Sequence, residues 1–286
     1  MLFTIAIPTY NNAKTVSKAI ESAINQDYKD EYEILVVNNA STDETANIIS
    51  AYAEMPKVRI VTNSETVDLF ANHNVCFQEA LGEYVLFIHS DDKLCENALT
   101  ILDEEIRKCH YPKRFIIWGH SMMYDFQTRI EEGGQSLNQP FCGENAAACF
   151  LKGGLTPSGT CYSRKSILEI GGFPKMKSRI TPHDWYVLIW AAFNYFEFEM
   201  VSRLIYIRTD YTTSASVKSS NQISTANKEM FGMLFEKFNS SQKKKFLDIV
   251  AHYGSLYLIN LLKREFSYKD LLKARFRSII RTYHNL

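Results

Sequence analysis

Two adjacent carboxylates, Asp91 and Asp92, are the strongest candidates for chemistry in this sequence. They directly follow an apolar run at residues 84–88. Neighbouring carboxylates at the end of a buried strand repel and desolvate each other unless a cation or an array of donors compensates. Mg²⁺ or Mn²⁺, with diphosphate oxygens and water completing its shell, would compensate them. Taken alone, the pair is more typical of an exposed turn or a helix start.

A third carboxylate, Asp184, lies in the tripeptide His183-Asp184-Trp185. A carboxylate within hydrogen-bond reach of an acceptor hydroxyl can take its proton as that hydroxyl attacks. The preceding Thr181-Pro182 also fits the start of a helix running to residue 193, so Asp184 has a second interpretation as a helix cap. The two roles are compatible.

The elements that must position these carboxylates alternate between strand and helix. Apolar runs predict four strands, at residues 3–7, 33–37, 58–61 and 84–88. Helical spacing and a capping-box pattern predict helices between them, at residues 16–24, 41–52 and 74–81. Runs that are apolar throughout suit parallel strands covered on both faces. The series predicts a doubly wound α/β sheet that binds its ligands at the carboxyl ends of the strands, residues 8–11, 38–41 and 89–92.

The pattern changes in the rest of the chain. From residue 115 it loosens into a strand and Gly-rich turns, which indicates mixed sheet and loops. From about residue 222 apolar stripes recur at helical spacing. We therefore expect an α/β domain followed by a helical extension.

Four segments together resemble the family 2 glycosyltransferases. They read IPTYN at residues 7–11, VVNNASTD at 36–43, ALGEY at 80–84 and FIHSDD at 87–92, and the resemblance resumes at residues 171–173 and 183–185. It implies a GT-A fold, with a Rossmann-like, mostly parallel sheet flanked by helices. The catalytic domain would cover residues 1–221, with a nucleotide-binding half at 1–110 and an acceptor half at 111–221, and the helical region would cover 222–286.

The resemblance implies a nucleotide site at the strand ends. Its residues would be Pro8, Thr9, Tyr10, Asn11, Asn39, Asn74, Ser90 and Asp91. Asn39 stands where aspartate is commonest; its amide oxygen can still accept from a pyrimidine N3–H, although the amide also donates. Asn38 likewise replaces a frequent aspartate, and ordinary turn chemistry is its alternative role. His73 stands where arginine is common, which would remove one charged contact to the nucleotide.

The resemblance also implies a divalent cation, Mn²⁺ or Mg²⁺, held by Asp91, Asp92 and Asp210. The family's Asp-x-Asp motif reads His89-Ser90-Asp91 here, and we interpret His89 as a packed histidine at a strand end rather than a ligand. Arg208 matches the family pattern, whereas Asp210 replaces a histidine and has a loop salt bridge as its alternative role.

The acceptor side would include His183, Trp185, Ser158 and Gly159, with Asp184 as the general base of an inverting transfer. The loop at residues 155–160 has an ordinary turn as its alternative role.

Composition limits the partners and the location. The 32 basic and 32 acidic residues cancel, so no broad field favours nucleic acid. Residues 222–286 carry 12 Lys or Arg against 5 Asp or Glu, a pattern that also suits anionic lipid headgroups. No signal peptide or apolar run of roughly 20 residues is evident, so we expect a cytoplasmic protein that can contact the inner face of the membrane. The six cysteines form no C-x-x-C pair and are expected to be reduced.

The predicted function is transfer of a sugar from a nucleoside-diphosphate sugar, with UDP favoured, to a hydroxyl of a glycan or lipid-linked glycan. A bacterial surface polysaccharide, such as lipopolysaccharide or capsule, is the expected setting. Two alternatives remain open. One is a catalytically silent nucleotide-sugar-binding module, because several motif positions depart from the family. The other is a sugar nucleotidyltransferase, which should show a Gly-rich loop with Arg or Lys where this chain has Pro8-Thr9-Tyr10-Asn11-Asn12.

Overall fold

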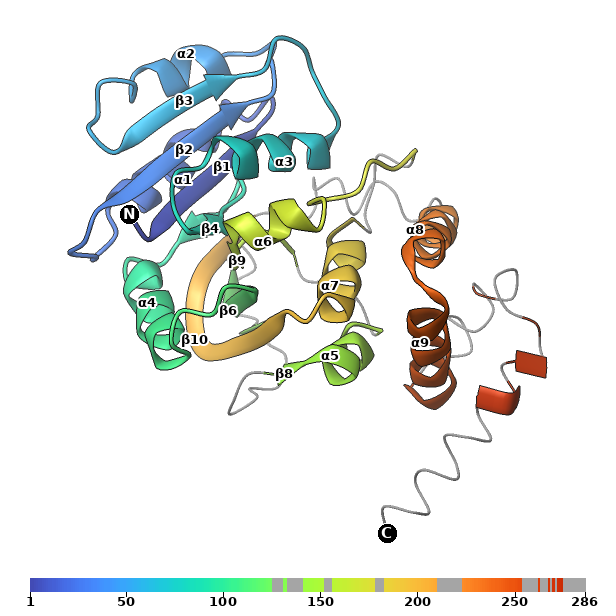
Figure 1. The fold of residues 1–286 in the computed structure, drawn as a ribbon. Helices are drawn as coiled ribbons and strands as arrows, with labels where there is room; N and C mark the ends of the chain where they lie inside the picture. The colour runs from blue at the N-terminus through green and yellow to red at the C-terminus, as the bar shows by residue number, and fades with distance from the viewer. Residues whose placement is uncertain are drawn as a thin grey trace.

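A single twisted sheet organises the chain (Figure 1). The computed structural model describes residues 1–124, 131–132, 141–151, 156–177, 183–209 and 223–253, together with 262, 267, 269–270 and 272–274. The strand order is β3-β2-β1-β4-β9-β6-β10-β5, with β7 and β8 added beside β6 and β10. The strands are β1 (Phe3–Thr9), β2 (Tyr32–Asn38), β3 (Val58–Thr62), β4 (Tyr84–Phe87), β5 (Lys93–Leu94), β6 (Phe115–Tyr124), β7 (Glu131–Glu132), β8 (Phe141–Cys142), β9 (Thr160–Ser163) and β10 (Glu197–Thr209).

The first four strands form the parallel half of the sheet. Strand β1 pairs in parallel with β2 and β4, and β2 pairs in parallel with β3, so their carboxyl ends meet at one edge. Pairing of β1 with β4 ends at Ala6 and Phe87, whereas pairing with β2 continues to Thr9 and Asn38. Pro8, which has no N–H to donate, lies where β1 has already parted from β4.

The second half of the sheet is mixed, as its looser sequence pattern predicts. Strand β9 runs antiparallel to both β4 and β6, and β10 runs parallel to β6 and antiparallel to β5. Strand β10 curves strongly (Figure 1), and its register against β6 shifts twice between Val201 and Tyr206. The curve carries the end of β10 back to β5, next to the acidic segment.

Helices cover both faces of the sheet, and side chains of β1 alternate between two cores. Phe3, Ile5 and Ile7 belong to the core shared with α1 and α4, whereas Ala6 belongs to the core shared with α3, α5, α6 and α7. The helices of this part are α1 (Val16–Ile24), α2 (Thr45–Ser50), α3 (Leu69–Glu79), α4 (Ala98–Lys108), α5 (Gly143–Phe150), α6 (Arg164–Glu169) and α7 (His183–Phe193). Burial on both faces explains the uniformly apolar strands.

Two predicted helices differ from the observed ones at their ends. Helix α3 begins at Leu69, five residues before the predicted start, because the Asp68 carboxylate accepts hydrogen bonds from the N–H groups of Phe70 and Ala71. Helix α2 ends at Ser50 rather than continuing to Tyr52.

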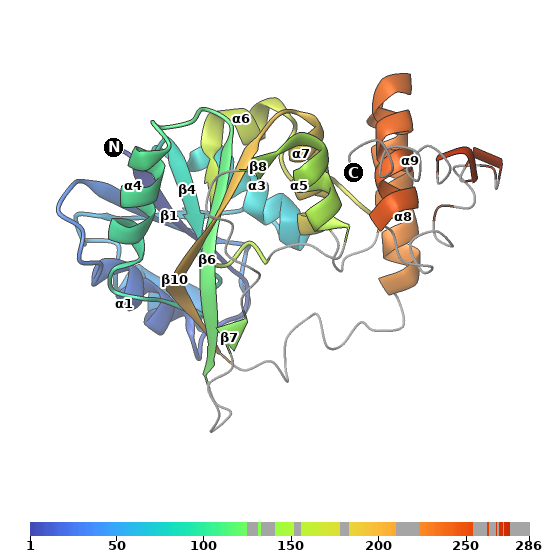
Figure 2. The same ribbon diagram turned by 90° about the horizontal axis from the view of Figure 1, so that it is seen from below.

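The C-terminal helices α8 (Ile223–Lys237) and α9 (Ser240–Tyr253) pack beside α5 and α7 (Figure 2). Phe246 of α9 is fully buried and contacts Phe193 of α7 and Phe231 of α8, so these helices share a core with the sheet domain. No helix in the described residues is long and apolar enough to cross a membrane. The second predicted stripe of the tail, at residues 272–283, lies largely outside the described residues, as do most of its basic side chains.

The six cysteines are free, as predicted.

Candidate functional site

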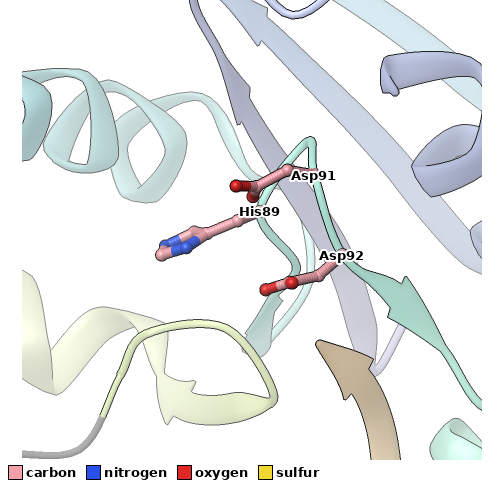
Figure 3. A group of neighbouring side chains, drawn as sticks. All are labelled: His89, Asp91 and Asp92. Carbon is pink, nitrogen blue, oxygen red and sulfur yellow. The ribbon is translucent and has the colours of Figure 1, made fainter. Parts of the chain in front are cut away.

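A tight turn directly after β4 brings three potential cation ligands together. The Asp92 N–H donates to the His89 carbonyl over 2.9 Å, which closes the turn. One ligand atom each from His89, Asp91 and Asp92 lies within 4.8 Å of the others, and the three side chains extend to the same side of the turn (Figure 3). A group of one imidazole and two carboxylates fits a divalent cation.

The side chain of Ser158 makes two hydrogen bonds to this turn. Its hydroxyl donates to the Asp92 carboxylate over 2.6 Å and accepts the N–H of His89 over 3.2 Å. Both Ser158 and Asp92 are buried. The sequence predicts that Ser158 lines the acceptor pocket, and that role stays a prediction; in the structure its hydroxyl orients the carboxylate of the turn.

Gly159, the other loop residue expected on the acceptor side, packs against β10. Its φ is +75°, and a Cβ at this position would lie 2.1 Å from the ring of Tyr206. Its N–H donates to the Phe87 carbonyl over 2.8 Å. Only glycine fits this contact, so the residue serves the close packing of the loop beneath the site.

Burial and the charge of Arg208 set the electrostatics of the turn. Burial raises the pKa of Asp91, and the positive charge of Arg208 opposes that rise. Burial, with a smaller effect of Arg208, lowers the pKa of His89 to about 4. The imidazole of His89 is therefore neutral at pH 7 and has one nitrogen lone pair. This makes His89 a possible cation ligand, whereas the sequence was interpreted as placing a packed histidine here.

Arg208 reaches the site from the end of β10, as its match to the family pattern suggested. Its charge acts on both His89 and Asp91. An arginine beside a carboxylate turn can neutralise phosphate oxygens held there. The next predicted ligand in the chain, Asp210, lies outside the described residues.

His73 contacts His89. Its Nε2 is 3.2 Å from Nε2 of His89, and its Nδ1 is 2.7 Å from the carbonyl oxygen of Leu69. The side chain is fully buried. Sequence reasoning treated the two histidines as separate departures, but the structure brings them into contact.

The loop after β1 is tied to the loop after β2. Asn11 has φ +52°, and its side-chain oxygen accepts the N–H of Thr42 over 2.8 Å while its own N–H donates to Ser41 Oγ over 3.0 Å. The Asn38 side chain accepts the Ser41 N–H over 3.1 Å, which is the turn role that was its alternative. Asn11 and Asn38 therefore shape the strand ends through backbone contacts.

Asn39 uses its amide to fix the loop before α3. Its oxygen accepts from the Val67 N–H and from the Asn63 side chain, each over 2.9 Å, and its nitrogen donates to the Val67 carbonyl over 2.8 Å. An amide oxygen has two lone pairs, and both are occupied. The predicted role of Asn39 as acceptor of a base N3–H therefore conflicts with its contacts in this structure.

Asn63 is a candidate that sequence reasoning missed. It follows β3 directly, and its side-chain nitrogen donates to both Asn39 and Asn72, which orients the amide. With both hydrogens engaged, its oxygen is the group left to accept from a ligand. The sequence signal that could have identified Asn63 is its position directly after β3, because the ends of the parallel strands β1, β2 and β3 lie side by side.

Thr9 and Tyr10 retain groups suited to a ligand. The hydroxyl oxygen of Thr9 is buried and has no hydrogen-bond partner within the described part of the chain. A buried hydroxyl without a partner is costly, so a bound ligand or water is its expected partner. Tyr10 is 44% exposed at the same strand end and has a ring available for stacking. Pro8 and Ser90, by contrast, are buried.

Asn74 is hydrogen-bonded to the backbone of Phe173. Its amide oxygen accepts the Phe173 N–H and its nitrogen donates to the Phe173 carbonyl, both over 2.9 Å. A Cβ on Gly172 would lie 2.4 Å from the Asn74 oxygen. Asn74 thus holds the Gly171-Gly172-Phe173 turn against α3 with one donor and one acceptor of its amide, and its contact with the nucleotide stays a prediction.

Asp184 lies in the first turn of α7 and is partly buried. Its carboxylate accepts the Trp185 N–H over 2.9 Å; because α7 begins at His183, Asp184 lies inside the first turn rather than at the N-cap position that its alternative role required. Burial raises its pKa to about 6, although hydrogen bonds from the backbone oppose the rise. A carboxylate with a pKa near the working pH is well matched to general-base chemistry.

Trp185 anchors this helix start. Its indole N–H donates to the Phe150 carbonyl, and its ring meets Phe231 of α8 edge-on at 5.2 Å. The side chain of His183, the remaining acceptor-side candidate, lies outside the described residues.

Comparisons with known proteins find relatives of this chain among glycosyltransferases. Residues 4–140 match the family model described as Glycosyl transferase family 2. The poly(ribitol-phosphate) beta-N-acetylglucosaminyltransferase TarS of Staphylococcus aureus is 35% identical over 112 residues, which cover 36% of this chain and 19% of TarS. A Campylobacter jejuni protein named GalNAc(5)-diNAcBac-PP-undecaprenol beta-1,3-glucosyltransferase is 24% identical over 96% of this chain and 87% of its own length.

The same fold occurs in a solved structure. The crystal structure of S. aureus TarS 1-349 in complex with UDP-GlcNAc superposes with a TM-score of 0.70 at 18% identity, over 96% of this chain and 79% of that one. In sequence, the aligned parts span only about a fifth to a third of the first curated relatives, TarS and an uncharacterised protein from Mycobacterium tuberculosis. The family model, these relatives and the shared architecture lead to one conclusion: residues 4–140 belong to the family 2 glycosyltransferases, and the chain has the GT-A fold.

Proposed function

We propose that this chain transfers a sugar from a UDP-sugar to a hydroxyl of a glycan or lipid-linked glycan, with inversion at the anomeric carbon. The observation that carries the proposal is the partly buried turn at residues 89–92: the Ser158 hydroxyl orients its Asp92 carboxylate, and the charge of Arg208 acts on Asp91. The similarity to TarS, which was solved in complex with UDP-GlcNAc, supports a UDP-sugar donor. The similarity to the C. jejuni glucosyltransferase, whose name includes a PP-undecaprenol substrate, supports a lipid-linked acceptor.

A divalent cation, Mn²⁺ or Mg²⁺, is part of this proposal. Asp91, Asp92 and His89 would hold it, and Asp210 would contribute if it reaches the turn. The bound ion would supply positive charge to the diphosphate as it leaves. Arg208 acts in the same direction, since its guanidinium can share the diphosphate charge.

The donor nucleoside would lie over the strand ends. Tyr10 would stack on the base, the Thr9 hydroxyl would find its missing partner there, and the Asn63 oxygen would accept from the base. This arrangement transfers the base-reading role from Asn39 to Asn63, because the Asn39 oxygen is already saturated.

Asp184 would act as the general base. The acceptor oxygen forms a bond to the anomeric carbon, the bond from that carbon to the diphosphate oxygen breaks, and the acceptor proton passes to Asp184. The raised pKa of Asp184 favours this role, since the conjugate acid is stable enough to hold a proton near pH 6. Its position in the first turn of α7 fixes the carboxylate without occupying both oxygens.

A lipid-linked acceptor would bring the protein to a membrane surface. The excess of basic residues in 222–286 suits anionic headgroups, and we propose peripheral contact at the inner face of the membrane through this region. Flotation with anionic vesicles, with and without residues 263–286, tests the contact. Equal flotation of both forms would contradict it.

The function is tested by following nucleoside diphosphate release from a panel of nucleotide sugars, with Mn²⁺, with Mg²⁺ and with excess chelator. We expect release from a UDP-sugar that depends on the cation, and acceptor-dependent transfer that Asp184→Asn abolishes while UDP affinity is retained. Full turnover in excess chelator contradicts the cation requirement. Nucleotide binding without any release from any donor indicates the silent binding module instead.

A further inference from the structure

We propose that His73 is a positioning residue for the cation site. It fixes the tautomer of His89 so that Nδ1 of His89 is a nitrogen ligand beside Asp91 and Asp92. The inference rests on the proposed cation dependence. It adds that His73 orients His89 as a ligand and that the site prefers Mn²⁺ or Co²⁺ over Mg²⁺.

The proton on His73 is located by its neighbour in α3. A backbone carbonyl oxygen can only accept, and that of Leu69 is 2.7 Å from Nδ1 of His73. Nδ1 of His73 therefore carries a proton. The contact is between residues four apart on one helix, so α3 itself sets it.

Burial keeps His73 neutral. The side chain has no exposed surface, and its ring packs against Phe70 at 5.4 Å, Phe87 at 5.1 Å and Phe173 at 5.6 Å between centroids. An imidazolium among these rings would be strongly disfavoured. A neutral imidazole with its proton on Nδ1 has its lone pair on Nε2.

That lone pair determines the tautomer of His89. The two Nε2 atoms are 3.2 Å apart, so Nε2 of His89 must carry the proton and donate it to His73. The lone pair of His89 is then on Nδ1, the ring nitrogen nearer the backbone of the turn. The chain of contacts runs from the Leu69 carbonyl through His73 to the cation group of His89, Asp91 and Asp92.

This arrangement predicts the metal preference of the site. An imidazole nitrogen suits Mn²⁺ and Co²⁺ better than Mg²⁺, which favours oxygen ligands throughout. Partners that orient a ligating histidine typically change metal affinity by about 10–100-fold. Relatives in the family commonly have arginine in place of His73 and aspartate in place of His89; the two departures touch each other in this chain and so act as one unit.

The test uses the full chain with UDP and Mn²⁺, after labelling all histidines with ¹⁵N. Electron spin-echo spectroscopy of bound Mn²⁺ reports a directly coordinated nitrogen, and a Mn²⁺ titration reports affinity. His73→Gln keeps an acceptor for the His89 proton, His73→Leu offers no polar group, and His73→Arg offers only donors. His252→Gln changes an exposed histidine of α9 and is the matched control.

We expect a nitrogen coupling in the wild type, His73→Gln and His252→Gln, with similar Mn²⁺ affinity. In His73→Leu, and more strongly in His73→Arg, the affinity should fall by about 10–100-fold and the coupling should weaken or vanish. The double variant His73→Arg/His89→Asp should bind Mn²⁺ without nitrogen coupling and should bind Mg²⁺ better relative to Co²⁺ than the wild type does. Circular dichroism of each variant identifies those that fold. If His73→Arg does not fold, His73→Leu is the variant compared with the wild type.

Mn²⁺ bound beside UDP with no nitrogen coupling in the wild type overturns this inference and leaves the proposed function intact. Equal coupling and affinity in folded His73→Leu and His73→Gln also overturns it. A protein that binds UDP but no Mn²⁺ contradicts the cation requirement, and this inference fails with it.

Discussion

The Ser158 hydroxyl donates a hydrogen bond of 2.6 Å to the Asp92 carboxylate across 66 residues of sequence, and both side chains are buried. The same oxygen accepts the N–H of His89, so one side chain holds both ends of the turn. A loop that the sequence predicts on the acceptor side thus supports the acidic turn. The orientation of a ligand carboxylate depends on such partners.

Replacement of Ser158 by alanine should therefore weaken cation binding. With UDP present, the apparent Mn²⁺ affinity should fall by about 10–100-fold, because the Asp92 carboxylate loses the partner that orients it. Stability should fall by about 1–3 kcal/mol, since the buried His89 N–H also loses its acceptor. A Mn²⁺ titration of transfer activity and thermal unfolding measure the two effects. Unchanged Mn²⁺ dependence in a folded Ser158→Ala protein would show that the hydrogen bond has no role in the site.

Replacement of Asp184 by asparagine should stabilise the protein while it abolishes transfer. The folded-state pKa of Asp184 is raised to about 6, above the value of about 3.9 for an unfolded chain. The native state then binds a proton more tightly than the unfolded state, so this group makes the protein less stable as pH rises from about 4 to about 6. At pH 7 the asparagine variant avoids that cost and still accepts the Trp185 N–H.

Allowing for the partial exposure of Asp184, we expect a gain of about 1–2 kcal/mol in the free energy of unfolding at pH 7. The gain should disappear at pH 4, where the wild-type carboxyl is largely protonated in the folded state and half protonated in the unfolded state. Denaturant unfolding at the two pH values measures it. A variant that is destabilised equally at both pH values would indicate that Asp184 acts only through its hydrogen bond to the Trp185 N–H.

Transfer activity should depend on pH through the same group. A general base must be ionised, so kcat/KM should fall about tenfold per pH unit below the Asp184 pKa of about 6 and level off above it. Steady-state kinetics between pH 5 and 8, at saturating Mn²⁺ and with UDP affinity measured in parallel, test this. A rate that stays flat down to pH 5 would remove Asp184 from the proton transfer.

Replacement of Asn74 by alanine should affect stability rather than nucleotide affinity. Both of its amide groups bond the backbone of Phe173, and their loss should cost about 1–3 kcal/mol. UDP affinity, measured by calorimetry at a temperature where the variant is folded, should stay within about threefold of the wild type. Asn63→Ala is the matched comparison, because the proposed site predicts that it weakens UDP binding. A large loss of UDP affinity in folded Asn74→Ala would restore its predicted nucleotide role.

The sequence by itself determined the order of the elements, the parallel first half of the sheet and the place of the acidic turn. These features follow from local patterns: apolar runs for buried strands, helical spacing between them, and the polar residues that end each strand. Because parallel strands bring their carboxyl ends to one edge, the turn after β4 could be assigned to the site before its contacts were known.

Only the tertiary structure decided which polar side chains at that edge remain available to a ligand. Asn39 and Asn74 carry the residue types that a nucleotide site needs, yet the Asn39 oxygen already accepts two hydrogen bonds, and the Asn74 amide is held by the backbone of Phe173, 99 residues away. Arg208 comes close to the turn because β10 curves back toward it. His73 contacts His89 because its ring in α3 packs against Phe87 at the end of β4. Hydrogen-bond capacity is finite and is shared among groups that folding brings together, so residue type alone cannot reveal whether a donor or acceptor is already engaged.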